Sequence, residues 1–180
     1  NNPISRMYAT QALKLLIGSI DKAVFHGDNE KARANMLKGS MFAGIAFANS
    51  PVAAVHALAY PIGGIFHIPH GLSNALILPY VLRFNQLDQK AAHAYADLCD
   101  YIWPLKDPKK GVQYKSSFFI EKLVELSGRV GLEARLRDVG IPKESCEKMA
   151  KESMKQTRLL VNNPRYITEK DSLDIYLAAW

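Results

Sequence analysis

The sequence predicts an all-α protein, a multi-helix bundle. Along most of the 180 residues, apolar side chains recur at the spacing that gives a helix one buried face. Runs that alternate β-branched and polar residues are absent, and so are the Asn-Gly and Asp-Gly pairs typical of hairpins. With 48% hydrophobic and 22% charged residues, a chain of this length can build a hydrophobic core, which argues against disorder.

The first two predicted helices lie on either side of a polar turn. Pro3 suits the entry to a helix that is expected over residues 4–25. A turn over residues 26–29 follows, and Asn29 is the expected N-cap of a second helix over residues 30–49. Because small residues let a neighbouring helix approach closely, the second helix is expected at the centre of the bundle. Its small residues are Gly39, Ser40, Ala43, Gly44, Ala46 and Ala48.

Proline and glycine punctuate the middle of the chain. Pro51 is expected to start a short helix, and the Pro-Ile-Gly-Gly segment over residues 61–64 is expected to end it. Pro69 then sits at the start of another helix, which runs to about residue 84.

The last third of the chain is also predicted to be helical. The expected elements are a polar helix over 86–101, a loop over 103–111, and helices over 114–127, 142–161 and 172–179. Thr168 and Asp171 form a T-x-x-D capping signature just ahead of the last helix.

The charge pattern argues against a nucleic-acid-binding protein. The formal charge is +6, with 17 acidic residues mixed among 23 basic ones. Proteins that bind nucleic acid usually gather Lys and Arg into a stripe. Here the clusters are Lys109–Lys110 and the region 129–137, and acidic residues interrupt the second. A solvated basic face explains this pattern better.

Neither a membrane span nor a disulfide framework is expected. The most apolar stretch covers residues 41–66, but it is interrupted by Asn49, Pro51, His56 and Pro61, whereas a span needs roughly 20 apolar residues. Cys99 and Cys146 are expected to be free thiols in a reducing cytoplasm.

A histidine-rich segment is the strongest candidate for chemistry. Three of the five histidines, His56, His67 and His70, lie close together. The Pro-Gly-Gly break between them lets the chain turn back, so that His56 on one helix faces His70 at the start of the next. Imidazole is a good ligand for Fe²⁺ and Zn²⁺, but one or two more ligands must come from elsewhere. From spacing alone, a metal site and a pair of core histidines stay equally open.

Two further residues of this segment are candidates for a pocket. Tyr60 lies four residues after His56, on the same side of a helix, where it can bond a substrate or a bound water or fill a core gap. Pro69 makes a continuous helix through His67 and His70 improbable, so His67 is expected to line a pocket without being a ligand.

Other motifs are weak or absent. His93 and Asp97 have metal-capable spacing, but their polar surroundings favour a solvent-facing pair, and His26 belongs to a turn. No G-x-S-x-G elbow and no G-x-G-x-x-G fingerprint occurs. A nicotinamide cofactor would therefore bind mainly outside these residues.

A longer pattern surrounds the two histidines. It comprises Ser40, Ala43–Gly44, Ala46–Phe47, Asn49, His56, Pro69–His70–Gly71, Asn74–Ala75, Leu78–Pro79 and Asn85. Further matches are Asn2–Pro3, Ala12–Leu13, Asp28, Glu30, Ala32–Arg33, Asn163–Pro164–Arg165, Thr168 and Asp171. With these residues the chain resembles the iron-containing, or group III, alcohol dehydrogenase family over nearly its whole length.

This resemblance implies a fold and a domain organisation. The family joins an N-terminal α/β domain that binds NAD or NADP to a helical, dehydroquinate synthase-like C-terminal domain that holds a metal. Residues 1–180 are then a helical metal-binding catalytic domain. The family's metal has four ligands, an Asp and three His, of which His56 and His70 match two. The other two form a D-x-x-x-H pair that this chain lacks, so they are expected upstream of Asn1, and the fragment alone is expected to be inactive.

The resemblance also implies an activity. The family transfers hydride between an alcohol and NAD(P)⁺, with Fe²⁺ or alternatively Zn²⁺ as the Lewis acid, and forms dimers or larger assemblies. Many members carry a histidine near the nicotinamide where this chain has Tyr60. That role then falls to Tyr60 or to His67. The alternatives are a dehydroquinate synthase-like lyase or maleylacetate reductase-like enzyme, or a non-catalytic helical module in which both histidines are merely buried.

Overall fold

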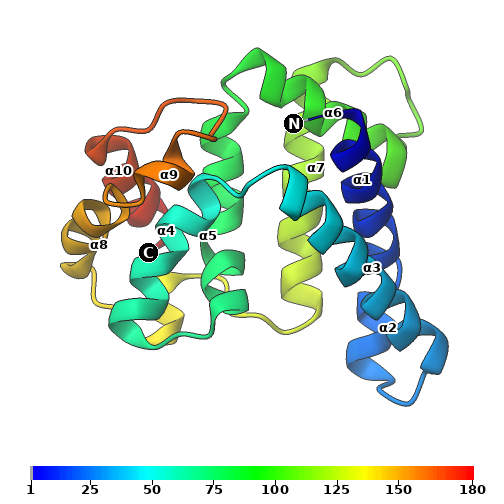
Figure 1. Ribbon diagram of the computed structural model, residues 1–180, viewed down its shortest axis with the longest axis horizontal. Coiled ribbons are helices and arrows are strands. Elements are labelled where there is room, and N and C mark those ends of the chain that lie inside the picture. Colours follow the sequence, from blue (N-terminus) through cyan, green and yellow to red (C-terminus); the bar gives the residue numbers. More distant parts are fainter. Residues whose placement is uncertain (1) are drawn as a thin grey trace. The chain divides into compact units, whose positions relative to one another are not determined.

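The computed structural model describes residues 2–180 and shows helices and no strand among them (Figure 1). The predicted all-α class is therefore confirmed for the described part of the chain. The chain divides into two compact units, Asn1–Pro51 and Val52–Trp180, which are treated one at a time. No single helix in the described range is long and apolar enough to cross a membrane.

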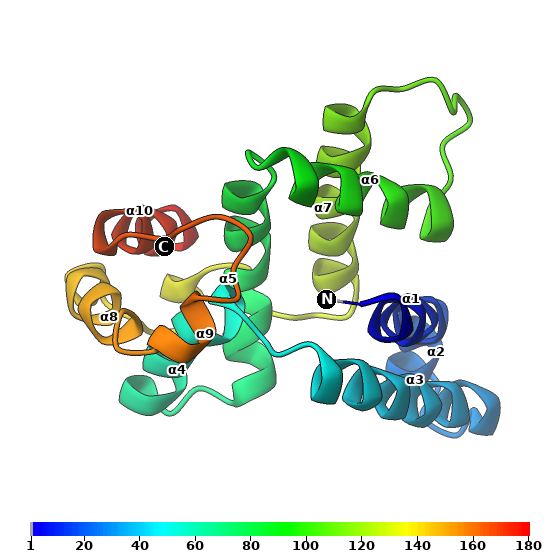
Figure 2. The ribbon, with the colours of Figure 1, turned by 45° about the horizontal axis from the view of Figure 1, so that its top comes forward.

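The first unit is an antiparallel helix pair with a short connecting helix. Its elements are α1 (Pro3–Ile17), α2 (Ile20–Phe25) and α3 (Glu30–Asn49). Helices α1 and α3 lie side by side in both ribbon views (Figures 1 and 2). At one end of the pair the Ser5 and Ser50 hydroxyls lie 2.7 Å apart, and at the other Asn35 Nδ2 donates to Ser19 Oγ at 3.1 Å.

The predicted single helix over residues 4–25 is wrong, because the chain turns at Gly18 and Ser19. Glycine costs a helix about 1 kcal/mol relative to alanine, so the helix ends where the apolar pattern alone would continue it. Asn29, by contrast, is confirmed as the N-cap of α3, since its side chain accepts a hydrogen bond of 2.9 Å from the Ala32 N–H.

The expectation that α3 lies at the centre of a bundle is not met within its own unit, where α3 packs against α1 and α2. Only one stripe of this helix is buried, and among its small residues Ser40, Gly44 and Ala48 are exposed. Gly39 is the position that needs to be small. A Cβ atom added there would lie 2.8 Å from Leu16 Cγ and 3.3 Å from Leu15 Cβ on α1. Of these small residues, Gly39 therefore serves the close contact with α1.

Two alanine substitutions in α3 are expected to have opposite effects. Gly39→Ala should lower the free energy of unfolding by about 1–3 kcal/mol, because Leu16 must move to make room. Gly44→Ala meets nothing within 4 Å and should raise stability by up to about 1 kcal/mol through helix propensity. Urea denaturation of the two variants measures the difference. Equal effects of the two substitutions would show that the close contact between Gly39 and α1 does not contribute to stability.

The second unit is built around a helical hairpin. Its helices are α4 (Ala54–Phe66), α5 (His70–Asn85), α6 (Gln89–Ile102), α7 (Val112–Arg129), α8 (Ser145–Ser153), α9 (Thr157–Leu160) and α10 (Glu169–Ala179), with a 3₁₀ turn at Leu136–Val139. Helices α4 and α5 form the hairpin; α8 and α9 contact α4, and α10 contacts α5 and α8. Helix α7 also contacts α5 and pairs with α6 (Figure 2).

The hydrophobic core of this unit includes buried residues of α4 and of the helices around it. Leu58 and Ile62 of α4, Ile77 of α5, Met149 of α8 and Tyr176 of α10 are all fully buried. The Tyr176 hydroxyl donates to the Leu58 carbonyl oxygen at 2.6 Å, which satisfies a buried phenol. The α4–α5 hairpin therefore packs against α8 and α10.

The predicted boundaries of the helix around His56 are wrong. The helix begins at Ala54 rather than at Pro51, and it runs through Pro61 and Gly64 to Phe66. Proline removes one hydrogen bond from a helix interior and normally kinks it. Pro61 is buried here, so core packing overrides the local preference.

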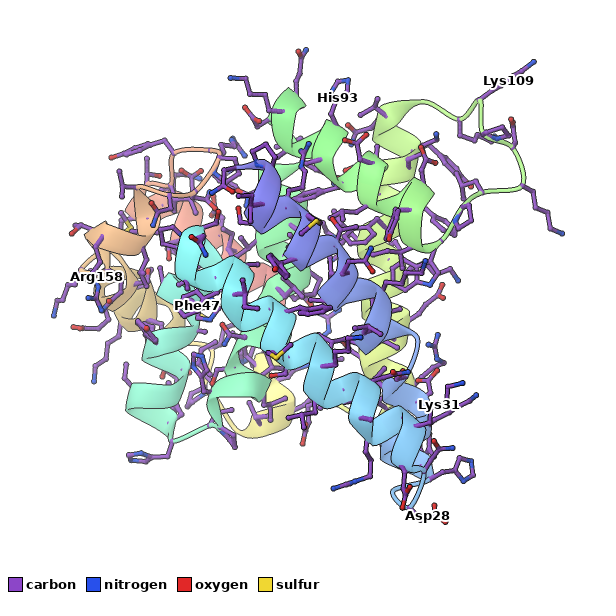
Figure 3. The ribbon with its side chains drawn as sticks, turned by 45° about the vertical axis from the view of Figure 1, so that its right-hand side comes forward. Asp28, Lys31, Phe47, His93, Lys109 and Arg158 are labelled. Carbon is purple, nitrogen blue, oxygen red and sulfur yellow. The ribbon has the colours of Figure 1, made fainter. Side chains whose placement is uncertain are left out.

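Of the other predicted elements, two have wrong boundaries and three are confirmed. The helix expected over 142–161 is divided into α8 and α9, and the polar helix starts at Gln89, behind the Asp88 cap, rather than at 86. The helix after Pro69 and the loop before α7, which carries Lys109, are confirmed (Figure 3). So is the cap of α10, in which Thr168 and Asp171 bond each other's backbone N–H groups.

Candidate metal centre

The structure brings His56 and His70 together. His56 is the third residue of α4 and His70 is the first residue of α5. Their ring centroids are 5.3 Å apart, with the ring planes tilted by 54°. The expectation that the two histidines face each other is confirmed. The break responsible lies at residues 67–69 and not at the Pro-Gly-Gly segment, which is helical.

Local contacts hold this three-residue turn in place. His67 ends α4 in the left-handed conformation, with φ of 57°, and its N–H donates to the Gly63 carbonyl at 3.0 Å. The buried Ser73 hydroxyl lies 3.2 Å from the Ile68 carbonyl and 3.1 Å from that of Pro69. A Cβ on Gly63 would lie 3.3 Å from the Ile68 oxygen. Glycine therefore allows the turn that places His70 to pass close to α4.

His70 has a polar neighbour whose contact with the ring was not predicted. Asn74 lies four residues further along α5, and its Nδ2 is 3.0 Å from His70 Nε2. The same nitrogen donates to the His70 carbonyl oxygen at 3.1 Å. Residues four apart share one face of a helix, so this spacing could have identified Asn74 beforehand.

The environment of His56 favours its neutral form. Partial burial, and then repulsion from a charged His70, lower the pKa of His56 from its usual value near 6.5. A metal binds imidazole only through a nitrogen that carries no proton. His56 therefore keeps its ligand form to lower pH than an ordinary histidine.

This lowered pKa makes the stability of the metal-free protein depend on pH. The unfolded chain binds the His56 proton at its usual pKa near 6.5, whereas the folded chain binds it only at lower pH. Stability should thus be unaffected by His56 above about pH 6.5 and should fall as the pH drops toward the folded-state pKa. Urea denaturation at several pH values measures this slope. A His56→Gln variant should have a shallower slope, and an identical slope would contradict the assignment.

Tyr60 and His67 are placed differently. Tyr60 lies beside the histidine pair, with its ring centroid 6.2 Å from that of His70, and it is 38% exposed. His67 is exposed at the end of α4. Its backbone conformation, which favours glycine, gives it a role in ending the helix.

Replacing His67 with glycine is expected to stabilise the fold. A residue other than glycine pays about 1 kcal/mol or more in the left-handed conformation. His67→Gly should therefore raise the free energy of unfolding by about 1 kcal/mol, and the matched variant His67→Ala should not. Thermal unfolding of both variants compares them. A loss of stability with glycine would show that the imidazole makes a contact that matters more than backbone strain.

The remaining histidines lie elsewhere. His93 projects from the outer side of α6 (Figure 3), and its Nδ1 lies 2.7 Å from the Gln89 carbonyl oxygen. His93 and Asp97 are both exposed, as expected, and so is His26. Within residues 2–180 no group of three or more His, Cys, Asp or Glu could hold a metal ion. The described chain therefore offers two neighbouring imidazoles, fewer donors than a metal site usually has.

Known proteins of one family are similar to this chain over nearly its whole length. The model of the Fe-containing alcohol dehydrogenase family, C-terminal, matches residues 1–180. Long-chain-alcohol dehydrogenase 1 of Geobacillus thermodenitrificans is 38% identical over 99% of this chain and 45% of its own length. The crystal structure of a 1,3-propanediol oxidoreductase has a TM-score of 0.93 at 30% identity, covering 99% of this chain and 46% of that one.

A more distant structure shares the fold alone. Maleylacetate reductase from Rhizobium sp. strain MTP-10005 has a TM-score of 0.81 at 21% identity, over 99% of this chain and 46% of that one. The chain spans about half the length of the curated relatives it matches. Since the family model matches every residue, the chain belongs to the Fe-containing alcohol dehydrogenase family, and it corresponds to that family's C-terminal region.

Proposed function

We propose that the protein carrying this chain is a metal-dependent, NAD(P)-linked alcohol dehydrogenase. The observation that carries the proposal is the pair of imidazoles 5.3 Å apart, on two helices joined by a three-residue turn, in a chain of this family. Residues 1–180 supply the helical metal-binding domain. Since relatives are named for long-chain alcohols and 1,3-propanediol, the proposed substrates are primary or secondary alcohols and the matching aldehydes or ketones.

The proposed metal site uses His56 and His70 as two of four ligands. The other two, an Asp and a His, and most of the NAD or NADP site lie outside this chain. Fe²⁺ is the first candidate metal and Zn²⁺ the second, because imidazole suits both. The metal, when bound, supplies Lewis acidity at the substrate oxygen. We place the enzyme in the reducing cytoplasm, as a dimer or larger assembly; both cysteines are free and buried, in keeping with this.

Residues of this chain then bind the metal and orient the substrate. His56, kept neutral by burial and by His70, offers a lone pair near neutral pH. Tyr60, beside His70 and partly exposed, can hydrogen-bond a substrate hydroxyl with its phenol oxygen. We assign proton transfer to Tyr60 first and to His67 second, since of these two residues Tyr60 has a ring contact with His70.

Tyr60→Phe should lower turnover while metal content stays normal. Unchanged turnover in His67→Gly would show that His67 takes no part in proton transfer.

Metal removal tests the proposed function directly. The purified protein is dialysed against a chelator, and formation of NADH or NADPH is followed with a panel of alcohols. Activity should vanish with the metal and return on adding Fe²⁺ or Zn²⁺. Full activity in metal-free protein would contradict the proposal, as would metal-loaded protein that oxidises no alcohol. The second result would favour a lyase or a non-catalytic module.

A further inference from the structure

The Asn74 side chain makes an unusual pair of contacts with a single residue. Its Nδ2 lies 3.0 Å from His70 Nε2 and 3.1 Å from the His70 carbonyl oxygen. Its other polar atom, Oδ1, is buried and has no hydrogen-bond partner within the described chain. Buried amide oxygens are nearly always paired, so the Asn74 amide faces His70 although its oxygen makes no hydrogen bond within the described chain.

The two contacts determine which ring nitrogen of His70 carries the proton. A backbone carbonyl oxygen can only accept, so the amide must turn its NH₂ group toward His70, and the opposite orientation would set two oxygens against each other. The same NH₂ group also faces Nε2. Nε2 must therefore be the accepting nitrogen, and the proton of a neutral His70 must lie on Nδ1.

We propose that Asn74 is a positioning residue that holds His70 in the Nδ1-protonated form and occupies the Nε2 lone pair until a metal takes it. This inference rests on the proposed function for its last step, since one lone pair cannot serve both the amide and a metal. The arrangement without metal leaves a buried oxygen unsatisfied, so Asn74 loses little when it releases the ring.

The tautomer is measured first, in metal-free protein labelled with ¹⁵N-histidine. At about pH 8, where imidazoles are ordinarily neutral, NMR should show the His70 proton on Nδ1. In Asn74→Ala the Nε2-protonated form should appear at His70, while His93 in the same sample should not change. A proton on Nε2 in the unsubstituted protein would overturn the inference, as would a tautomer that is the same in both proteins.

The metal affinity is measured second, by competition of Zn²⁺ with a chromophoric chelator. Asn74→Ala removes a hydrogen bond that the metal must displace, so the dissociation constant should fall about two- to tenfold. A higher or unchanged dissociation constant for Zn²⁺ would show that the Asn74 amide does not compete with the metal for His70 Nε2. Asn49→Ala is the matched control, because Asn49 Nδ2 also donates to the carbonyl four residues earlier, at 2.9 Å, but that residue is Ile45 and not a histidine.

The two measurements separate this inference from the proposed function. Protein that binds no Zn²⁺ in any form would refute the proposed metal site, and the tautomer of His70 would still decide what Asn74 does. Protein that binds Zn²⁺ equally with and without the Asn74 amide would refute only the inference.

Discussion

Replacing His70 with alanine is expected to abolish metal binding and to lower kcat/KM about a thousandfold. Loss of a ligand removes the ion, and with it several kcal/mol of transition-state stabilisation, at about 1.4 kcal/mol for each factor of ten. His56→Ala should behave in the same way, because the two rings lie 5.3 Å apart and are proposed to share one metal. Metal content by elemental analysis and initial rates with a preferred alcohol measure both effects.

His93→Ala is the control for these variants. It removes an imidazole from the exposed surface of α6, where the ring nitrogen Nδ1 lies 2.7 Å from the Gln89 carbonyl oxygen, so metal content and rate should not change. Folding is checked by circular dichroism, since His56 is partly buried. Full metal content in folded His56→Ala or His70→Ala would show that these histidines only pack.

The spacing of residues was enough to predict that His56 and His70 meet. The turn at residues 67–69 brings the two rings together, so the prediction of their contact is right although the predicted position of the break is wrong. The error has a physical cause. Proline and glycine in Pro61–Gly64 indicate a helix end from local preference, but Pro61 is buried in the core, and packing decided the boundary.

Packing also explains the unmet expectation for α3. Its small residues lie all around the helix, and composition cannot say which of them meet a neighbour. Gly39 faces α1, whereas Gly44 has nothing within 4 Å. The contact of Asn74 with His70 was missed for a different reason: the four-residue spacing places the two side chains on one face of the helix, but whether they bond depends on which way the amide points.

Replacing Leu58 with alanine is expected to lower the free energy of unfolding by about 2–5 kcal/mol. Leu58 is fully buried in the core cluster of the second unit, on the helix that carries His56 and Tyr60. Shortening it removes buried apolar surface and leaves a cavity that neighbours fill only in part. Urea denaturation followed by circular dichroism measures the loss.

Leu87→Ala is the matched control, since that leucine is 68% exposed in the same unit and should change stability by less than about 0.5 kcal/mol. Because the Tyr176 hydroxyl bonds the Leu58 backbone and not its side chain, α4 keeps that anchor in Leu58→Ala. Metal content should therefore stay normal at temperatures where the variant is folded. Metal loss from folded Leu58→Ala would mean that His56 depends on tight packing of α4 as well as on the turn before His70.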